Sequence, residues 1–207
     1  MNTELLDSLT RFSSPNVFNP WSSRDEKDCT GLGADGRKRR LLQHFDCNPI
    51  MILVGEAPGY QGCRFSGVPY TSERLILSGR IPRITESGRL TTRKLSFSEP
   101  SATVVWGMLD DLGIGDRVVM WNAFAWHPHE PGNPYSNRAP SRAELAAGLP
   151  ILCGVMAHFA GVPVVPVGRK AEETLMALEV KAMPWVRHPS RSGAALFREE
   201  LRARFVS

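Results

Sequence analysis

Apolar positions along the chain follow two patterns that alternate. Continuous apolar runs, ended by glycine or a polar residue, occur in "PIMILVG", "DRVVMWNA" and "VPVVPVG", and a shorter one in "MPWVRHPS". Such runs are typical of strands that are covered on both faces, as in parallel sheets. The prolines of "VPVVPVG" place that strand at an edge of the sheet or at a strand end. The pattern therefore predicts four strands.

Segments with helical spacing lie between and around these strands. They are "TELLDSLTRF", "GRKRRLLQHF", "VPYTSERLILSG", "SATVVWGMLDDLGI", "SRAELAAGLPILCGVMAHFAG", "RKAEETLMAL" and "SGAALFREELRARF". Ser141 stands three residues before Glu144, which indicates a capping box at the start of a helix. The alternation of strands and helices predicts an α/β fold, a three-layer α/β/α sandwich with a central, mainly parallel four-stranded sheet.

Length and composition favour one domain. The 207 residues are 42% hydrophobic and 22% charged, enough to bury a core without disulfides or metals. We expect a single domain over 1–207, with 1–48 as an N-terminal helical and loop extension packed on it. No signal peptide or membrane-length run is evident, so we expect a cytoplasmic protein that does not bind membranes.

The charge balance leaves two interpretations open. The net charge is +4, and arginines outnumber lysines. Arginine suits bidentate phosphate contacts, but an ordinary basic protein would show the same balance. The basic run Arg37–Arg40 could touch phosphates, although a solvated helix face is the commoner explanation. The stretch "ESGRLTTRKLSFSEP" is either a loop near DNA or plain surface.

Three polar residues each follow a predicted strand. Glu56 follows "MILV", Asn122 follows "VVMW" and His188 follows "MPWV". Because ligands bind at the carboxyl ends of parallel strands, we expect these side chains to meet at one rim, beside Tyr70. Individually they could be a helix-start acid, a strand-end amide and a loop histidine. Together they offer a carboxylate, an amide that reads a ring edge, a hydrogen-bond donor and a stacking face. These groups suit recognition of a flipped base and cleavage of its bond to the sugar.

These segments resemble the uracil-DNA glycosylase superfamily. The similar motifs are "GEAPG", "GVPY", "NAFAWHP" with "NRAPS", and "HPS", in this order from about Ile50 to the C-terminus. The resemblance implies catalytic roles for Glu56, near the attacking water, and His188, at the base oxygen. It implies base-binding roles for Gly55, Ala57, Tyr70 and Asn122. It implies DNA-binding roles for Pro58, Gly59, Arg187, Pro189, Ser190, Arg191 and Ser192.

The chain departs from the superfamily's motifs in two ways, and its nearest relatives there are the bacterial and archaeal members whose first motif is also GEAPG. Those relatives hold a four-iron cluster on four cysteines, whereas Cys29, Cys47, Cys63 and Cys153 form no CxxC pair. We therefore expect a divergent branch with no iron–sulfur cluster, no other cofactor and no metal. Ala57 replaces an acid or amide, which shifts the water-activating role to Glu56. His127 and His129 lie in a loop without a basic insertion, so turnover is expected rather than covalent capture of DNA.

The expected function is hydrolysis of the N-glycosidic bond of uracil in DNA by a monofunctional, monomeric base excision repair enzyme. Hypoxanthine or xanthine as the main substrate is an alternative within the same class. A catalytically silent protein that binds uracil-DNA is a second alternative, favoured by Ala57. A nucleotide hydrolase with "GEAPG" as a phosphate loop is a third, disfavoured because the loop lacks a lysine and a metal-binding acid cluster.

Overall fold

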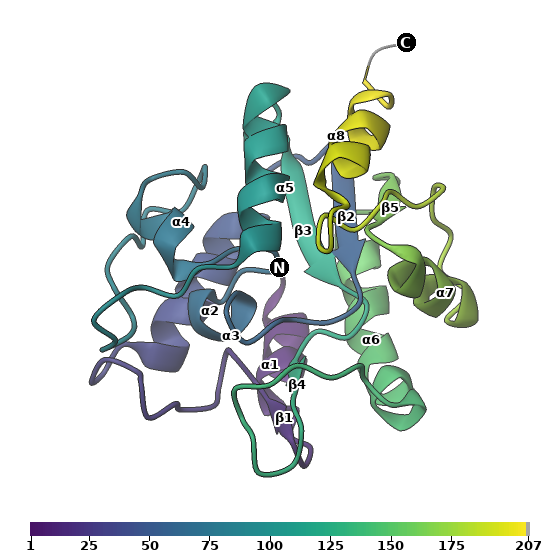
Figure 1. Ribbon diagram of the computed structural model, residues 1–207. Helices are drawn as coiled ribbons and strands as arrows, with labels where there is room; N and C mark the ends of the chain where they lie inside the picture. Colours follow the sequence, from purple (N-terminus) through teal and green to yellow (C-terminus); the bar gives the residue numbers. More distant parts are fainter. Residues whose placement is uncertain (206–207) are drawn as a thin grey trace.

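A three-stranded parallel sheet forms the centre of the molecule. The computed structural model describes residues 1–205. The strands β2 (Met51–Gly55), β3 (Val118–Asn122) and β5 (Val164–Pro166) lie in the order β3-β2-β5 (Figure 1). Every residue of the three strands is buried, so the interpretation of these apolar runs as doubly covered parallel strands is confirmed. β5 lies at an edge, as its prolines predicted.

The expected fourth strand is reduced to a single parallel bridge between Val186 and Val167. The Val186 N–H donates to Pro166 O at 2.9 Å, and the Gly168 N–H donates to Val186 O at 2.7 Å. The next pair of ladder bonds would need the N–H groups of residues 184 and 166, and both residues are proline. The four-stranded sheet is therefore not confirmed: regular pairing is interrupted at these prolines, and Met183 N–H instead donates to Val164 O at 2.8 Å.

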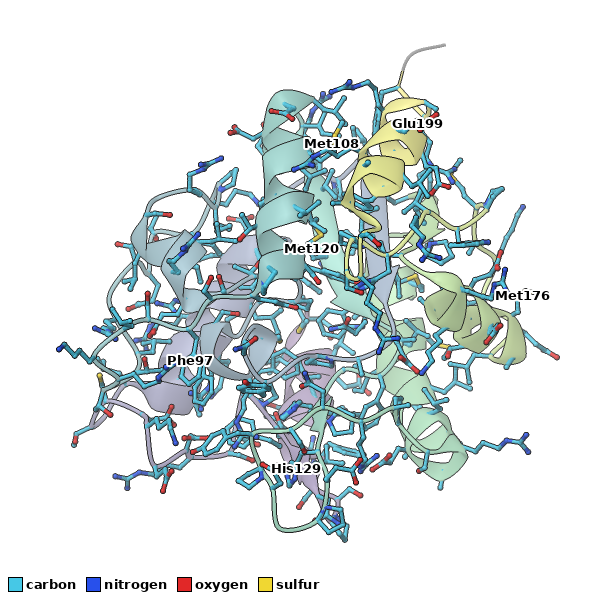
Figure 2. The ribbon with its side chains drawn as sticks, in the orientation of Figure 1. Phe97, Met108, Met120, His129, Met176 and Glu199 are labelled. Carbon is cyan, nitrogen blue, oxygen red and sulfur yellow. The ribbon has the colours of Figure 1, made fainter. Side chains whose placement is uncertain are left out.

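Helices cover both faces of the sheet. Neighbouring β2 residues face opposite cores: Ile52 packs in one hydrophobic cluster and Leu53 in the other. The first cluster includes side chains of α1 (Thr3–Arg11), α2 (Gly33–Phe45), α6 (Arg142–His158) and α7 (Arg169–Ala177). The second includes α4 (Glu73–Leu77), α5 (Pro100–Asp111) and α8 (Ala194–Arg202). Met108 of α5 and Met120 of β3 both belong to this second core (Figure 2).

Several short elements complete the fold. α3 (Cys63–Ser66) and the 3₁₀ turn η1 (Gly115–Arg117) are single turns. The two-residue strands β1 (Val17–Phe18) and β4 (His127–Pro128) pair antiparallel, where only loops were expected. The predicted capping box is present, since Glu144 N–H donates to Ser141 Oγ and Ser141 N–H to the Glu144 carboxylate. No described helix is long and apolar enough to cross a membrane.

The predicted helix "VPYTSERLILSG" is shorter than expected. Only Glu73–Leu77 is helical, because Tyr70 has a positive φ of 50° that a right-handed helix cannot accommodate. This backbone conformation turns the chain and sets Tyr70 apart from the helix that follows. Because α4 begins only at Glu73, the ring of Tyr70 is positioned by this turn and not by the helix.

The basic run Arg37–Arg40 does not form a solvated face. Arg37 and Arg40 are both 0% exposed. Arg37 pairs with Asp28 at 2.5 Å, and Arg40 donates to the backbone oxygens of Glu86 and Gly88. A buried guanidinium is costly unless it is hydrogen-bonded in this way. The sequence interpretation of this run was thus wrong at two of its positions, which hold neighbouring loops together.

The N-terminal segment packs on the rest of the chain. Trp21 Nε1 donates to Gly67 O at 2.9 Å, and Trp126 Nε1 donates to Leu9 O at 3.0 Å. Trp21 also stacks on Trp121 of β3, with ring centroids 5.9 Å apart. These contacts tie the segment to the sheet and to the loop that precedes Tyr70.

Candidate functional site

A cavity of about 740 Å³ opens beyond the carboxyl ends of β2 and β3. Most residues singled out from the sequence line it. They are Glu56, Ala57, Pro58, Gly59, Tyr70, Asn122, Arg187, His188, Ser190 and Arg191. The structure thus brings together the acid, the amide, the imidazole and the aromatic ring, as expected from the parallel strands.

Three of the predicted site residues do not line the cavity. Gly55 lies behind it: a Cβ there would come within 2.5 Å of Tyr70 Oη and 2.6 Å of Asn122 Oδ1. Only glycine permits this close approach. Pro189 is buried, and Ser192 is exposed in the loop beyond the rim.

Strand pairing fixes the first motif against Asn122. Gly55 and Asn122 are register partners in β2 and β3. Beyond the strands, Ala123 N–H donates to Gly55 O at 2.8 Å and Phe124 N–H to Glu56 O at 2.9 Å. These two hydrogen bonds continue the pairing of β2 and β3 beyond the ends of the strands, so the side chains of Glu56 and Asn122 project from hydrogen-bonded backbone.

The amide of Asn122 is buried without a partner. The residue is 3% exposed, and its Nδ2 makes no hydrogen bond with any described residue. A buried donor left unpaired typically costs about 1–3 kcal/mol. Asn122 lines the cavity, so this unpaired donor lies in the cavity wall.

Tyr70 holds its ring in the cavity wall through an unusual backbone. Its φ of 50° lies in the left-handed region, which a bulky residue seldom occupies. The side chain is 7% exposed, and its ring centroid is 6.0 Å from that of His188, at 44°. Burial raises the pKa of Tyr70, so its hydroxyl stays protonated near neutral pH. The two rings therefore lie next to each other in the cavity wall, and each offers an aromatic surface to a flat ligand.

The hydrogen bonds of His188 define its tautomer. The Ser190 N–H donates to His188 Nδ1 at 3.2 Å, and Ser190 Oγ lies 2.8 Å from the same nitrogen. Because a backbone N–H can only donate, Nδ1 carries the lone pair and the ring proton sits on Nε2. Burial, assisted by the charge of Arg187, lowers the pKa of His188. The residue is therefore a neutral donor at physiological pH.

Glu56 stands beside the first turn of α7. It is half-buried, and burial raises its pKa, while nearby Lys170 lowers it and Glu173 raises it. Ala57, the next residue, packs against the hydrophobic core and offers no polar group. Glu56 is thus the ionisable group that the first motif supplies to the cavity.

Four basic residues line the cavity: Arg169, Lys170, Arg187 and Arg191. None forms an ion pair with another side chain among residues 1–205. The loop that carries Arg191 is strained, since Arg191 and Ser192 have successive positive φ angles of 50° and 62°. This basic rim favours an anionic ligand at the mouth of the cavity.

The sequence did not single out several lining residues, including Cys63, Glu99, Asn137 and Trp185. Asn137 could have been found from the sequence, because it belongs to the motif "NRAPS". Its Oδ1 accepts from Tyr60 N–H at 2.8 Å and so fixes the loop after Gly59. No sequence motif pointed to Glu99, since an acid before Pro100 resembles an ordinary helix start.

The described part of the chain contains no group of three or more His, Cys, Asp or Glu that could hold a metal ion. The four cysteines are free thiols.

Comparisons with known proteins agree with this geometry. The family model described as "Uracil DNA glycosylase superfamily" matches residues 42–205. Among solved structures, the crystal structure of wild-type SMUG2 from Pedobacter heparinus is similar, with a TM-score of 0.64 and 17% identity. That match covers 98% of this chain and 95% of the other, and at this identity it shows a shared fold. No curated protein matches the chain by sequence.

Proposed function

The chain belongs to the uracil DNA glycosylase superfamily and is a DNA glycosylase, and from this premise we propose that it excises uracil from DNA by hydrolysing the N-glycosidic bond of a flipped nucleotide. The observation that carries the proposal is the buried, unpaired amide nitrogen of Asn122, a residue that lines the same cavity as Tyr70 and His188. An amide presents a donor and an acceptor, the complement of the lactam edge of uracil.

The side chains divide the chemistry between base and sugar. The base stacks on Tyr70 and pairs with Asn122. As the C1′–N bond breaks, its electron pair stays on the base, and His188 Nε2–H donates to the base oxygen where negative charge develops. The sugar becomes oxocarbenium-like; DNA phosphates and Glu56 stabilise this positive charge. Water then bonds to C1′, with its oxygen close to the Glu56 carboxylate, and its proton is finally taken up by the released base.

The basic rim would hold the DNA backbone. Arg187 and Arg191, predicted from the sequence, are joined by Arg169 and Lys170 at the start of α7. Guanidinium and ammonium groups bind phosphates without reading sequence. The strained Ser190–Ser192 loop, with Pro189 beneath it, would fill the space left by the flipped nucleotide, and Pro58 and Gly59 would approach the backbone from the other side.

Excision from labelled oligonucleotides tests the proposal directly. Abasic sites are read as strand breaks after alkali, using single- and double-stranded substrates with one uracil. We expect His188→Ala to lower the single-turnover rate on the order of 100- to 1000-fold, as for the loss of a transition-state donor. His158→Ala is the matched control, because His158 is exposed on α6 and does not line the cavity.

The alternatives give different results in the same assay. Release of hypoxanthine or xanthine in preference to uracil would reassign the main substrate within the glycosylase class. Uracil-DNA binding without strand breaks on any substrate would show a silent binding protein. A wild-type rate for His188→Ala on uracil would refute the assigned mechanism.

A further inference from the structure

A second carboxyl group lies in the cavity wall. Glu99 immediately precedes α5, yet its side chain makes no capping bond, and it forms no hydrogen bond or ion pair within residues 1–205. Two glycines make room for it. A Cβ on Gly62 would overlap Oε2 and lie 2.8 Å from Cδ, and a Cβ on Gly59 would lie 3.7 Å from Oε1. The carboxyl group therefore fills space that the loop 59–62 leaves open.

Glu99 and Glu56 occupy different walls of the cavity. The charges that act on Glu56 come from Lys170 and Glu173 of α7, on the side of the basic rim. Glu99 acts on Cys63 and Tyr70 and raises the pKa of both; Tyr70 also lies within the influence of Glu56. Both carboxyl groups therefore border the stacking ring, and Glu99 does so from the side of the loop 59–62.

We propose, on the basis of the glycosylase function above, that Glu99 is a specificity-determining residue whose carboxyl group contacts the flipped base. A neutral carboxyl group presents one O–H donor and one acceptor, which match the –CO–NH– edge of a lactam. An ionised carboxylate only accepts, and so matches an exocyclic amino group. Neutral Glu99 therefore selects deaminated bases, which have gained a carbonyl group, over their amino-bearing parents.

The surroundings of Glu99 favour its neutral form. Burial raises the pKa of Glu99 to about 7. The titratable groups that face it are the hydroxyl of Tyr70 and the thiol of Cys63, and burial raises the pKa of each, so both are uncharged. The amino end of α5 and the basic residues of the cavity rim favour the carboxylate, and burial opposes them. Below about pH 7 the group is a donor; as the pH rises through this value the donor is lost.

The decisive variants are Glu99→Gln and Glu99→Ala, compared by single-turnover excision between pH 6 and 9. Substrates carry one uracil, hypoxanthine, xanthine or cytosine. We expect the wild-type rate on deaminated bases to fall above about pH 7, and Glu99→Gln to remove this fall, because an amide donates at every pH. Glu99→Ala should lose on the order of 10-fold at pH 6, with a different factor for each base.

Gly62→Ala provides a second route to the same group. The new methyl would displace the Glu99 carboxyl without changing its chemistry, so base preference should shift as in Glu99→Ala. If both act through Glu99, the double variant should lose no more than Glu99→Ala alone. Thermal unfolding checks that each variant is folded.

The outcomes separate this proposal from the function on which it rests. Absence of excision by the wild type on every base overturns both. Wild-type excision with unchanged rates in Glu99→Ala overturns the role of Glu99 alone. Equal losses on all bases, with the pH profile retained in Glu99→Gln, would also overturn it, because that is how a purely structural residue behaves.

Discussion

Replacing Asn122 with alanine should raise stability while it abolishes most activity. In the free protein the amide is 3% exposed and its Nδ2 has no partner among the described residues. An unpaired buried donor destabilises the folded state by about 1–3 kcal/mol, so removing it should recover part of that free energy. The deleted atoms border an open cavity, so no closed void is left to offset this gain. We expect the free energy of unfolding to rise by about 1 kcal/mol, and excision to fall on the order of 100-fold because the base loses its partner.

Asn19 offers a matched control. It is also 3% exposed, but its Nδ2 donates to Leu9 O at 2.8 Å and to Phe12 O at 3.1 Å. Asn19→Ala should therefore lower the free energy of unfolding by about 2 kcal/mol and leave the excision rate of the folded protein unchanged. Urea unfolding followed by tryptophan fluorescence measures the first quantity, and the alkali strand-break assay the second. If Asn122→Ala also lost more than about 1 kcal/mol, Asn122 would be a structural residue and the reasoning would fail.

Two further predictions concern acid stability and salt. His44 is fully buried, its Nε2 accepts from Met120 N–H at 2.8 Å, and burial lowers its pKa to about 3. In the unfolded chain His44 takes up a proton near pH 6.5, whereas in the folded protein it does so only near pH 3, so the free energy of unfolding decreases as the pH falls from about 6.5 towards 3. At pH 5 this decrease is about 2 kcal/mol. The change in the free energy of unfolding between pH 7 and 5, measured with urea, should be smaller by that amount in His44→Gln. An unaltered pH dependence would show that His44 does not limit acid stability. Lys170→Ala should reduce the slope of log affinity for uracil-DNA against log salt by about 1, measured by fluorescence anisotropy, whereas the exposed Lys181→Ala should leave it unchanged. Equal slopes for the two variants would remove Lys170 from the DNA interface.

The sequence was sufficient to predict which strand ends meet. Glu56 and Asn122 follow apolar runs that proved to be neighbouring parallel strands, and Gly55 and Asn122 are register partners. The pattern of apolar residues indicates which segments are buried strands. Because strand–helix–strand units are right-handed, few arrangements of three such strands in one sheet are possible. His188 was placed correctly at the cavity although its strand was reduced to one bridge, because the chain still runs beside β5.

Contacts between distant segments could not be predicted in this way. Arg37 and Arg40 look like surface residues in a basic run, and only the loops that fold over α2 bury them. Glu99 reaches the cavity because Gly59 and Gly62, some forty residues earlier, leave space for it. Neither a local motif nor a period encodes such a contact. The fourth strand failed for a local reason, since Pro184 and Pro166 each lack the N–H that a regular ladder would need at their positions.

Several unfavourable features of this structure border one cavity. Tyr70 and Arg191 hold strained backbone conformations, Asn122 buries an unpaired amide, and Glu99 holds a carboxyl group away from any partner. Unpaired buried atoms also occur away from the cavity, for example Arg83 Nε and Trp121 Nε1. Asn122 and Glu99 differ from these because both line the cavity, where a ligand can supply the missing partners. A flat base with alternating donors and acceptors supplies these partners, so binding of the base should satisfy the polar groups that the free protein leaves unpaired.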